Sequence, residues 1–275
     1  MSSKKAKILL TNDDGVESPG LWAAAATLAE IGDLTIAAPR SQATSASRSM
    51  PITSDGIIEE RTISYQGKTW TAYAVGGSPA QVVIHSLEEI MTEPPDLVVS
   101  GINYGQNVGY STSVSGTVGA AIEAAASGIP GLAVSLEVTD MEQVYNHSTA
   151  VDFTAAGFFT AKFARLILKE QLPFDVDILK VEVPIEATPE TDWKMVRTAR
   201  HRGWRNSVQR KGSRWNEPAR IYGKAIIPEP AEVPRGTDIY TLYYEKKVAV
   251  SPLSIDPTSR ISLKELEEQM RNHAA

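Results

Sequence analysis

Short apolar runs alternate with helical stretches through the first two thirds of the chain. The first part contains an apolar run, a turn, an alanine-rich helical stretch and a second apolar run, at Ala6–Thr11, Asn12–Gly15, Gly20–Glu30 and Leu34–Ala38. This order predicts a β-α-β unit, and therefore a parallel sheet with a right-handed crossover. In such a sheet, residues that carry chemistry are expected on loops at the carboxyl ends of the strands.

The same alternation continues to Pro184. The predicted elements are a hairpin at Ile57–Tyr65 and Thr69–Val75, helix Pro79–Met91, strand Leu97–Ser100, helix Val118–Ser127, strand Leu132–Leu136, helix Val151–Lys169 and strand Ile178–Val183. We therefore predict an α/β fold with a Rossmann-like, mostly parallel sheet and helices on both faces. The sheet is expected to end at Val183, because Pro184 closes the last core strand.

Beyond residue 190 basic residues are interleaved with tryptophans. The basic residues are Arg197, Arg200, Arg202, Arg205, Arg210, Lys211, Arg214 and Arg220, and the tryptophans are Trp193, Trp204 and Trp215. One interpretation is a nucleic-acid-binding surface. The other is a hairpin arm whose tryptophans are buried against a second subunit. We favour the arm, because the whole chain is acidic and interface cores favour Trp and Arg; nucleic acid is not an expected partner.

The arm suggests a division of the chain into two parts. Residues 1–190 are predicted to form the α/β catalytic core. Residues 191–275 are predicted to form a C-terminal extension, packed on the core, with a β-hairpin arm and a terminal helix. That helix is expected at Ser259–His273, where Ser262 and Glu265 have the spacing of a capping box.

Composition sets limits on the function. With 275 residues, 42% of them hydrophobic, the chain can bury a substantial core. Its net charge of −6 gives no overall attraction to nucleic acid or to an anionic membrane. The absence of cysteine excludes disulfides, thiolate nucleophiles and sulfur-ligated zinc. The apolar run Ile8–Leu10 is too short for a secretory signal or a membrane span, so we expect a cytoplasmic protein without a membrane partner.

Asp13 and Asp14 are adjacent carboxylates that directly follow a predicted core strand. Like charges held close together raise each other's pKa unless a cation neutralises them. Mg²⁺ or Mn²⁺ suits such a site, because these ions prefer oxygen ligands and take only one or two carboxylates from the protein. The alternative is an Asp-Asp-Gly turn with solvated side chains.

Two further loops carry polar residues at strand ends or helix starts. Asn103 follows the strand Leu97–Ser100, where its side-chain oxygen could complete a coordination sphere; the alternative is that Asn103 and Asn107 occupy left-handed turn positions. Ser113, Ser115 and Thr117 surround Gly116 at the start of a helix. A helix N-terminus favours a phosphate, although ordinary N-capping is the alternative.

Together these motifs resemble the SurE family of survival-protein nucleotidases. The resemblance lies in Ile8–Gly20, Ala38-Pro39, Gly77–Ala80, Val99–Asn103, Ser115–Val118, Gly236–Asp238 and Ser251–Leu253, and so covers most of the chain. It implies an acid phosphatase or 5′/3′-nucleotidase that hydrolyses nucleoside monophosphates. It also implies one divalent metal held by two adjacent Asp, a Ser and an Asn, and a homodimer or homotetramer formed through exchanged C-terminal elements.

In this sequence the implied metal ligands are Asp13, Asp14, Thr44 and Asn103. Thr44 stands where the family usually has Ser; a threonine hydroxyl can still ligate, and Ser45 is the alternative. Gln81 stands where the family commonly has Asp, and Lys180–Pro184 replaces an Asn-containing strand. These two departures concern substrate details and not the implied metal ligands.

Hydrolysis of a phosphate monoester requires neutralised phosphoryl charge, a positioned water and a proton for the leaving alcohol. A divalent cation that bridges phosphate and water could supply the first two. We expect Asn107, Ser115, Gly116 and Thr117 to orient the phosphoryl group, with Asn107 and Ser115 as catalytic residues, and Asp13 to act as base as well as ligand. An aspartyl-phosphate intermediate is an open alternative.

Two other functions fit parts of the same pattern. A non-catalytic nucleotide- or nucleic-acid-binding protein could use the same anion loop without turnover. A haloacid-dehalogenase-type phosphatase needs Asp-x-Asp, with its two acids two residues apart, and the adjacency of Asp13 and Asp14 argues against it. We therefore predict a phosphomonoesterase that acts on nucleoside monophosphates.

Overall fold

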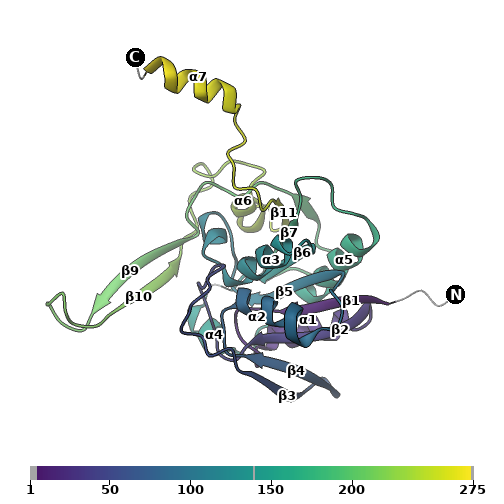
Figure 1. Cartoon of the computed structure of the whole chain (residues 1–275). Coiled ribbons are helices and arrows are strands. Elements are labelled where there is room, and N and C mark those ends of the chain that lie inside the picture. The colour runs from purple at the N-terminus through teal and green to yellow at the C-terminus, as the bar shows by residue number, and fades with distance from the viewer. Residues whose placement is uncertain (1–4, 139, 274–275) are drawn as a thin grey trace.

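A nine-stranded sheet forms the centre of the molecule (Figure 1). The computed structural model describes residues 5–138 and 140–273. The strands of this sheet are β1 (Ala6–Thr11), β2 (Gly32–Pro39), β3 (Ile58–Tyr65), β4 (Lys68–Val75), β5 (Leu97–Tyr104), β6 (Gly131–Leu136), β7 (Ile178–Val183), β8 (Trp193–Met195) and β11 (Val248–Leu253). Their order across the sheet is β3-β4-β2-β1-β5-β6-β7-β11-β8.

The middle of the sheet is parallel. β1 pairs in parallel with β2 on one side and with β5 on the other, and β5, β6 and β7 continue in parallel. All residues of β5 and β6 are buried, which is typical of parallel strands covered on both faces. From β1 the chain adds β2 on one side of the sheet. It later returns to add β5, β6 and β7 on the other side of β1, so the strand order reverses between β1 and β5. In open α/β sheets, ligands bind at such a switch point, beyond the carboxyl ends of the strands.

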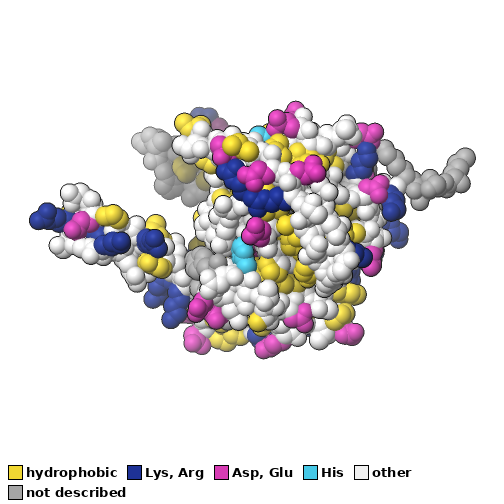
Figure 2. Space-filling model, turned by 90° about the horizontal axis from the view of Figure 1, so that it is seen from below, with side chains coloured by type: hydrophobic (Ala, Val, Ile, Leu, Met, Phe, Trp, Pro, Cys, Tyr) yellow, Lys and Arg dark blue, Asp and Glu magenta, His cyan; other side chains and the backbone are white. Residues whose placement is uncertain are grey.

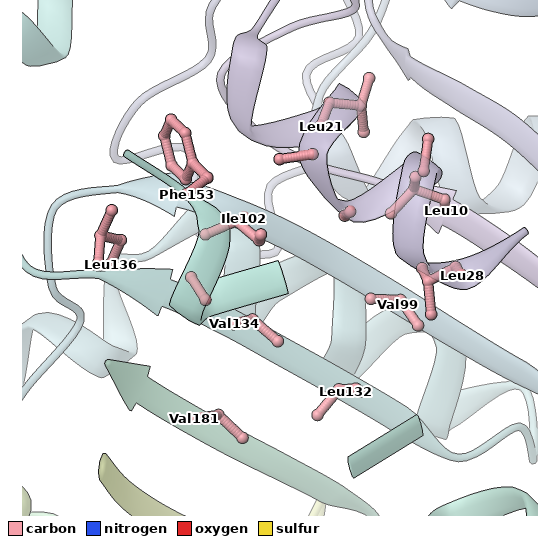
Figure 3. Packing of buried hydrophobic residues seen from close by; sticks show 14 of the residues in the cluster. Leu10, Leu21, Leu28, Val99, Ile102, Leu132, Val134, Leu136, Phe153 and Val181 are labelled. Atoms are coloured by element: carbon pink, nitrogen blue, oxygen red, sulfur yellow. The ribbon is translucent and has the colours of Figure 1, made fainter. Parts of the chain in front are cut away.

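Helices cover both faces of the sheet. The helical segments are α1 (Pro19–Leu28), α2 (Pro79–His85), η1 (Ser86–Ile90), η2 (Tyr110–Ser113), α3 (Gly116–Ala126), α4 (Met141–Tyr145), α5 (Thr154–Lys169), α6 (Asp238–Tyr243) and α7 (Leu263–His273). Alternate residues of β1 point to opposite faces. Ile8 and Leu10 pack in the core with α1 and α5, and Figure 3 shows Leu10 near Leu21 and Leu28 of α1. Leu9 packs on the other face with α2 and α3. The predicted Rossmann-like α/β fold is confirmed.

The prediction that the sheet ends at Val183 is wrong. β11 pairs antiparallel with β7, with Val250 opposite Val181, and β8 pairs in parallel with β11. The fully buried Val248 and Val250 join the core, and β11 covers the edge of β7, which would otherwise expose unpaired backbone groups. The division at residue 190 stays a prediction, although two strands from beyond it belong to this sheet.

The predicted hairpin arm and terminal helix are both present, but the prediction that Trp193 belongs to the arm is wrong. Trp193 lies in β8 of the central sheet, and its ring packs edge-on against Phe163 of α5 with 5.4 Å between the ring centroids. β9 (Trp204–Arg210) and β10 (Ala219–Ala225) form a separate antiparallel pair that projects from the body, and α7 stands away from it near the C-terminus (Figure 1). Lys and Arg side chains are prominent on the projecting arm (Figure 2). Across the part of the chain that the structure describes, no helix is both long and apolar enough to cross a membrane.

Candidate active site

Asp13 and Asp14 lie on the loop after β1, at the carboxyl edge of the sheet, and are 4% and 1% exposed. Asn12 shapes this loop: its Nδ2 donates to the carbonyl of Gly15 at 3.0 Å, and its Oδ1 accepts from the N–H of Gly15 at 3.1 Å. Gly15 has a φ of +97°, a conformation that favours glycine. The turn therefore holds both carboxylates inside the protein, and the alternative of a solvated turn is wrong.

Hydrogen bonds join each carboxylate to a different neighbouring element. Asp14 Oδ2 accepts from the N–H of Tyr104, the last residue of β5, at 3.0 Å, and its Oδ1 accepts from the Gln42 side chain at 3.3 Å. Asp13 Oδ1 accepts from the hydroxyl of Thr117, in the first turn of α3, at 2.7 Å. The pair thus connects the loops that follow β1, β2 and β5.

Burial makes this pair of acids electrostatically unfavourable. Burial raises the pKa of Asp13 to about 6, against the opposing effect of the Thr117 hydrogen bond. The pKa of Asp14 lies well above its usual value, first because of burial and second because of the negative charge on Asp13. Among the described residues, no Lys, Arg or His forms an ion pair with either group. A bound cation would relieve this repulsion.

The donor atoms around the pair fit a hard divalent cation. Within residues 5–138 and 140–273, no three His, Asp or Glu side chains could hold a metal ion together, so a cation here would also need amide or hydroxyl oxygens. Asn103 is 8% exposed near the end of β5, and its Nδ2 donates to the carbonyl of Gly105 at 2.6 Å. That bond commits the nitrogen and leaves the side-chain oxygen for another partner, and oxygen is the ligand that Mg²⁺ and Mn²⁺ prefer.

The loop after β2 brings Thr44 close to the pair. The N–H of Ala43 donates to the backbone carbonyl of Asp13 at 2.7 Å. Thr44 and Ser45 are both exposed, and Ser45 has a positive φ of 62°. The structure therefore brings this segment beside Asp13, and the choice between the two hydroxyls stays open.

The start of α3 packs directly on Asp13. A Cβ atom at Gly116 would lie 2.7 Å from the Cβ of Asp13, so glycine is required for this approach. The N–H groups of Thr117 and Gly116 face the Asp13 carboxylate and act to lower its pKa. Ser115 caps the helix, because its Oγ accepts from the N–H of Val118 at 3.1 Å. Ordinary N-capping thus applies to Ser115, while the first turn of α3 opens onto Asp13.

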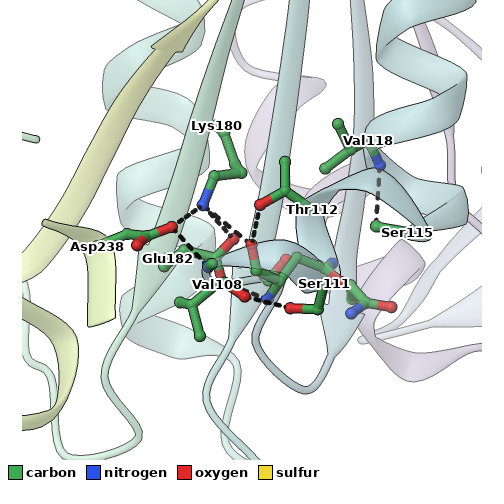
Figure 4. A network of polar contacts seen from close by, with 12 residues as sticks. Val108, Ser111, Thr112, Ser115, Val118, Lys180, Glu182 and Asp238 are labelled. Atoms are coloured by element: carbon green, nitrogen blue, oxygen red, sulfur yellow. Dashed lines mark hydrogen bonds and ion pairs between the residues drawn. The ribbon is translucent and has the colours of Figure 1, made fainter. Parts of the chain in front are cut away.

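Asn107 is 8% exposed, and its Nδ2 donates to the Ser135 hydroxyl at 3.0 Å. Beneath it lies a buried cluster of Lys180, Glu182 and Asp238 (Figure 4), which sequence reasoning missed. A signal was present, because Lys180 and Glu182 are charged residues within an otherwise apolar strand.

Gln81 has a structural role at the start of α2. Its backbone and side chain form a capping box with Ser78, and its side chain also accepts from the Ser54 hydroxyl at 2.7 Å. Its Nε2 donates to the carbonyl of Pro51 at 3.1 Å. This departure from the family pattern therefore ties the loop before β3 to α2.

The chain is similar to known proteins over most of its length. Residues 8–207 match the model of the family described as survival protein SurE. The chain is 37% identical to the 5′-nucleotidase SurE of Thermococcus kodakarensis over 262 residues, which cover 95% of this chain and 97% of that relative. It is 36% identical to the 5′-nucleotidase SurE of Methanothrix thermoacetophila over 264 residues, which cover 94% of this chain and 97% of that relative.

A solved structure is similar over the same extent. The crystal structure of the SurE protein from Aquifex aeolicus superposes with a TM-score of 0.73 at 26% sequence identity. The match covers 96% of this chain and 99% of that chain. The likeness therefore includes the C-terminal part as well as the central sheet.

Proposed function

Since the chain belongs to the survival protein SurE family, we propose that it is a divalent-metal-dependent phosphomonoesterase that hydrolyses nucleoside 5′- and 3′-monophosphates to nucleoside and phosphate. The observation that carries this proposal is the buried Asp13–Asp14 pair, which has no cationic partner among the described residues and lies against the start of α3. Such a pair favours a cation, and a cation beside a helix N-terminus favours a phosphate.

In this proposal Asp13, Asp14, Asn103 and Thr44 hold one Mg²⁺ or Mn²⁺ ion. When bound, the ion would act as a Lewis acid that offsets the phosphoryl charge and lowers the pKa of a water molecule. The support is the donor set: two buried carboxylates, an amide whose nitrogen is already committed, and a hydroxyl on a segment bonded to Asp13.

We assign Asn107, Ser115, Gly116 and Thr117 to the phosphoryl group. Helix N-termini bind anions through free N–H groups and the helix dipole, and α3 presents the N–H groups of Gly116 and Thr117 toward Asp13. Asp13 then lies between the phosphate-binding turn and the proposed metal ligands. It can accept the proton of a water that attacks phosphorus and displaces the nucleoside oxygen. Alternatively, its carboxylate can attack phosphorus, displacing the nucleoside oxygen, to form an aspartyl-phosphate that water then hydrolyses to phosphate.

The C-terminal part is proposed to assemble the protein into a homodimer or homotetramer by exchange between subunits. Three apolar side chains of the arm, Val208, Trp215 and Ile221, are 63%, 93% and 71% exposed. Isolated hairpins are marginal in water, and exposed apolar patches usually mark an interface. We place the protein in the cytoplasm.

The test of this function is phosphate release from 5′-AMP, 3′-AMP and p-nitrophenyl phosphate with Mn²⁺ or Mg²⁺, followed by addition of EDTA. Turnover that EDTA abolishes supports the proposal. Binding of AMP without turnover would instead support the non-catalytic alternative.

A further inference from the structure

Lys180, Glu182 and Asp238 form a fully buried charged cluster under the loop that joins β5 to η2 (Figure 4). Lys180 Nζ lies 3.0 Å from Asp238 Oδ2 and 3.4 Å from Glu182 Oε1. Lys180 and Glu182 come from β7, whereas Asp238 begins α6. The cluster therefore joins the central sheet to the C-terminal part of the chain.

The cluster binds backbone groups of the loop. The N–H of Asn107 donates to Glu182 Oε2 at 2.8 Å, and Lys180 Nζ donates to the carbonyl of Asn107 at 3.0 Å. The N–H of Gly109 donates to Asp238 Oδ2 at 3.0 Å. Buried backbone groups in a loop without a regular hydrogen-bond ladder need such partners, and bonds to charged groups are the stronger kind.

Stability alone does not account for these charges. An apolar set of similar volume is often as stable as a buried ion cluster. Burial lowers the pKa of Lys180, but Asp238 and Glu182 offset this, so its pKa lies above the usual value and the amine stays charged. The cluster has one cation and two acids, and the N–H groups of Asn107, Gly109 and Ala199 donate to those acids.

We propose that Lys180, Glu182 and Asp238 are positioning residues that hold Asn107 in the orientation needed for phosphate binding. The inference rests on the proposed function, which assigns Asn107 to the phosphoryl group. Both backbone groups of Asn107 are bonded to the cluster, and one amide hydrogen is bonded to Ser135. The remaining N–H of that amide is then fixed in direction as a donor to a phosphoryl oxygen.

Asp238 also connects this loop to residues 197–201, the segment that precedes β9 of the arm. Its Oδ1 accepts from the N–H of Ala199 at 2.8 Å, and the N–H of Tyr110 donates to the carbonyl of His201 at 2.9 Å. The two acids should therefore differ in effect. Glu182→Gln should loosen the loop alone, whereas Asp238→Asn should loosen the loop and the segment before β9.

The test compares Glu182→Gln, Asp238→Asn and the control Glu137→Gln. Glu137 is a buried acid that accepts from the N–H of Ile185, whereas the N–H groups of Asn107 and Gly109 donate to Glu182 and Asp238. Hydrogen exchange followed by mass spectrometry measures the exchange rates of the backbone amides in peptides that contain residues 105–110 and 197–201. We expect exchange of 105–110 to rise about tenfold in Glu182→Gln with 197–201 unchanged, and both to rise in Asp238→Asn. Glu137→Gln should match the wild type in both peptides.

Kinetics separate a positioning role from a structural one. In Glu182→Gln we expect the KM for AMP and the inhibition constant of inorganic phosphate to rise together by about tenfold, with kcat within about threefold of wild type. A KM for AMP and a phosphate inhibition constant equal to those of Glu137→Gln would overturn the inference.

If the wild type does not hydrolyse AMP, the proposed function fails separately, and calorimetric binding of inorganic phosphate takes the place of KM. Faster loop exchange with unchanged phosphate affinity would overturn the positioning role. Should Glu182→Gln not fold, Asp238→Asn still tests the phosphate affinity, with exchange expected to rise in both peptides.

Discussion

The hydroxyl of Thr117 donates a hydrogen bond of 2.7 Å to the carboxylate of Asp13, although 104 residues separate them in the chain. This bond places the start of α3 against the loop after β1. The groups proposed to bind phosphate and those proposed to bind the metal therefore meet at one carboxylate, at the point where the strand order reverses.

Replacing Asp13 tests its double role. Asp13→Asn should lower turnover of AMP by about 10³-fold, because it removes an anionic ligand and the proposed base. EDTA should have the same effect on the wild type. Asp33→Asn, which changes an exposed acid at the other end of β2, is the matched control and should retain wild-type activity. Near-wild-type turnover of Asp13→Asn in the presence of EDTA would contradict the assignment of Asp13 as a metal ligand.

The third ligand can be identified by comparing neighbouring hydroxyls. If Thr44 supplies the ligand, Thr44→Val should raise the Mn²⁺ concentration needed for half-maximal activity by about tenfold, because a coordinating oxygen is lost. Ser45→Ala should change this concentration little. The reverse ranking would show that the loop alignment is displaced by one residue.

The sequence predicts the parts of the site that depend on residues close together in the chain. The Asn-Asp-Asp-Gly turn and the Ser115 cap are local, so residue type and spacing indicate them. The cluster of Lys180, Glu182 and Asp238 depends on contacts across 58 to 129 residues, which periodicity does not report. The pairing of β11 with β7 was missed for the same reason.

Glu137 provides a pH-dependent prediction outside the site. Burial raises the pKa of Glu137, against the N–H of Ile185, which lowers it. Because the pKa of Glu137 is higher in the folded state, its protonated carboxyl favours folding at pH values below the unfolded pKa near 4.5. This contribution to the free energy of unfolding is lost as the pH rises through the pKa of the folded state. Glu137→Gln mimics the protonated form, so its stability relative to wild type should increase between pH 4.5 and neutral pH. Urea unfolding at both pH values measures this; a constant difference would contradict the argument.

Deleting the tip of the arm tests its role in assembly. Light scattering of the intact protein should report at least a dimer, and deletion of residues 206–220 should weaken or abolish it, because the exposed Trp215 lies in that segment. A wild-type monomer would contradict this. So would a deletion that leaves the oligomer unchanged but abolishes salt-sensitive binding of single-stranded nucleic acid.

The most direct measurement of the central claim is calorimetric titration of the EDTA-treated, dialysed protein with Mn²⁺. We expect about one ion per chain and an affinity at least about tenfold lower in Asp14→Asn, because a charge-assisted contact is lost. Glu137→Gln should bind like the wild type. Absence of Mn²⁺ binding in the wild type, or equal affinity in Asp14→Asn, would contradict the claim that the buried Asp13–Asp14 pair holds the metal.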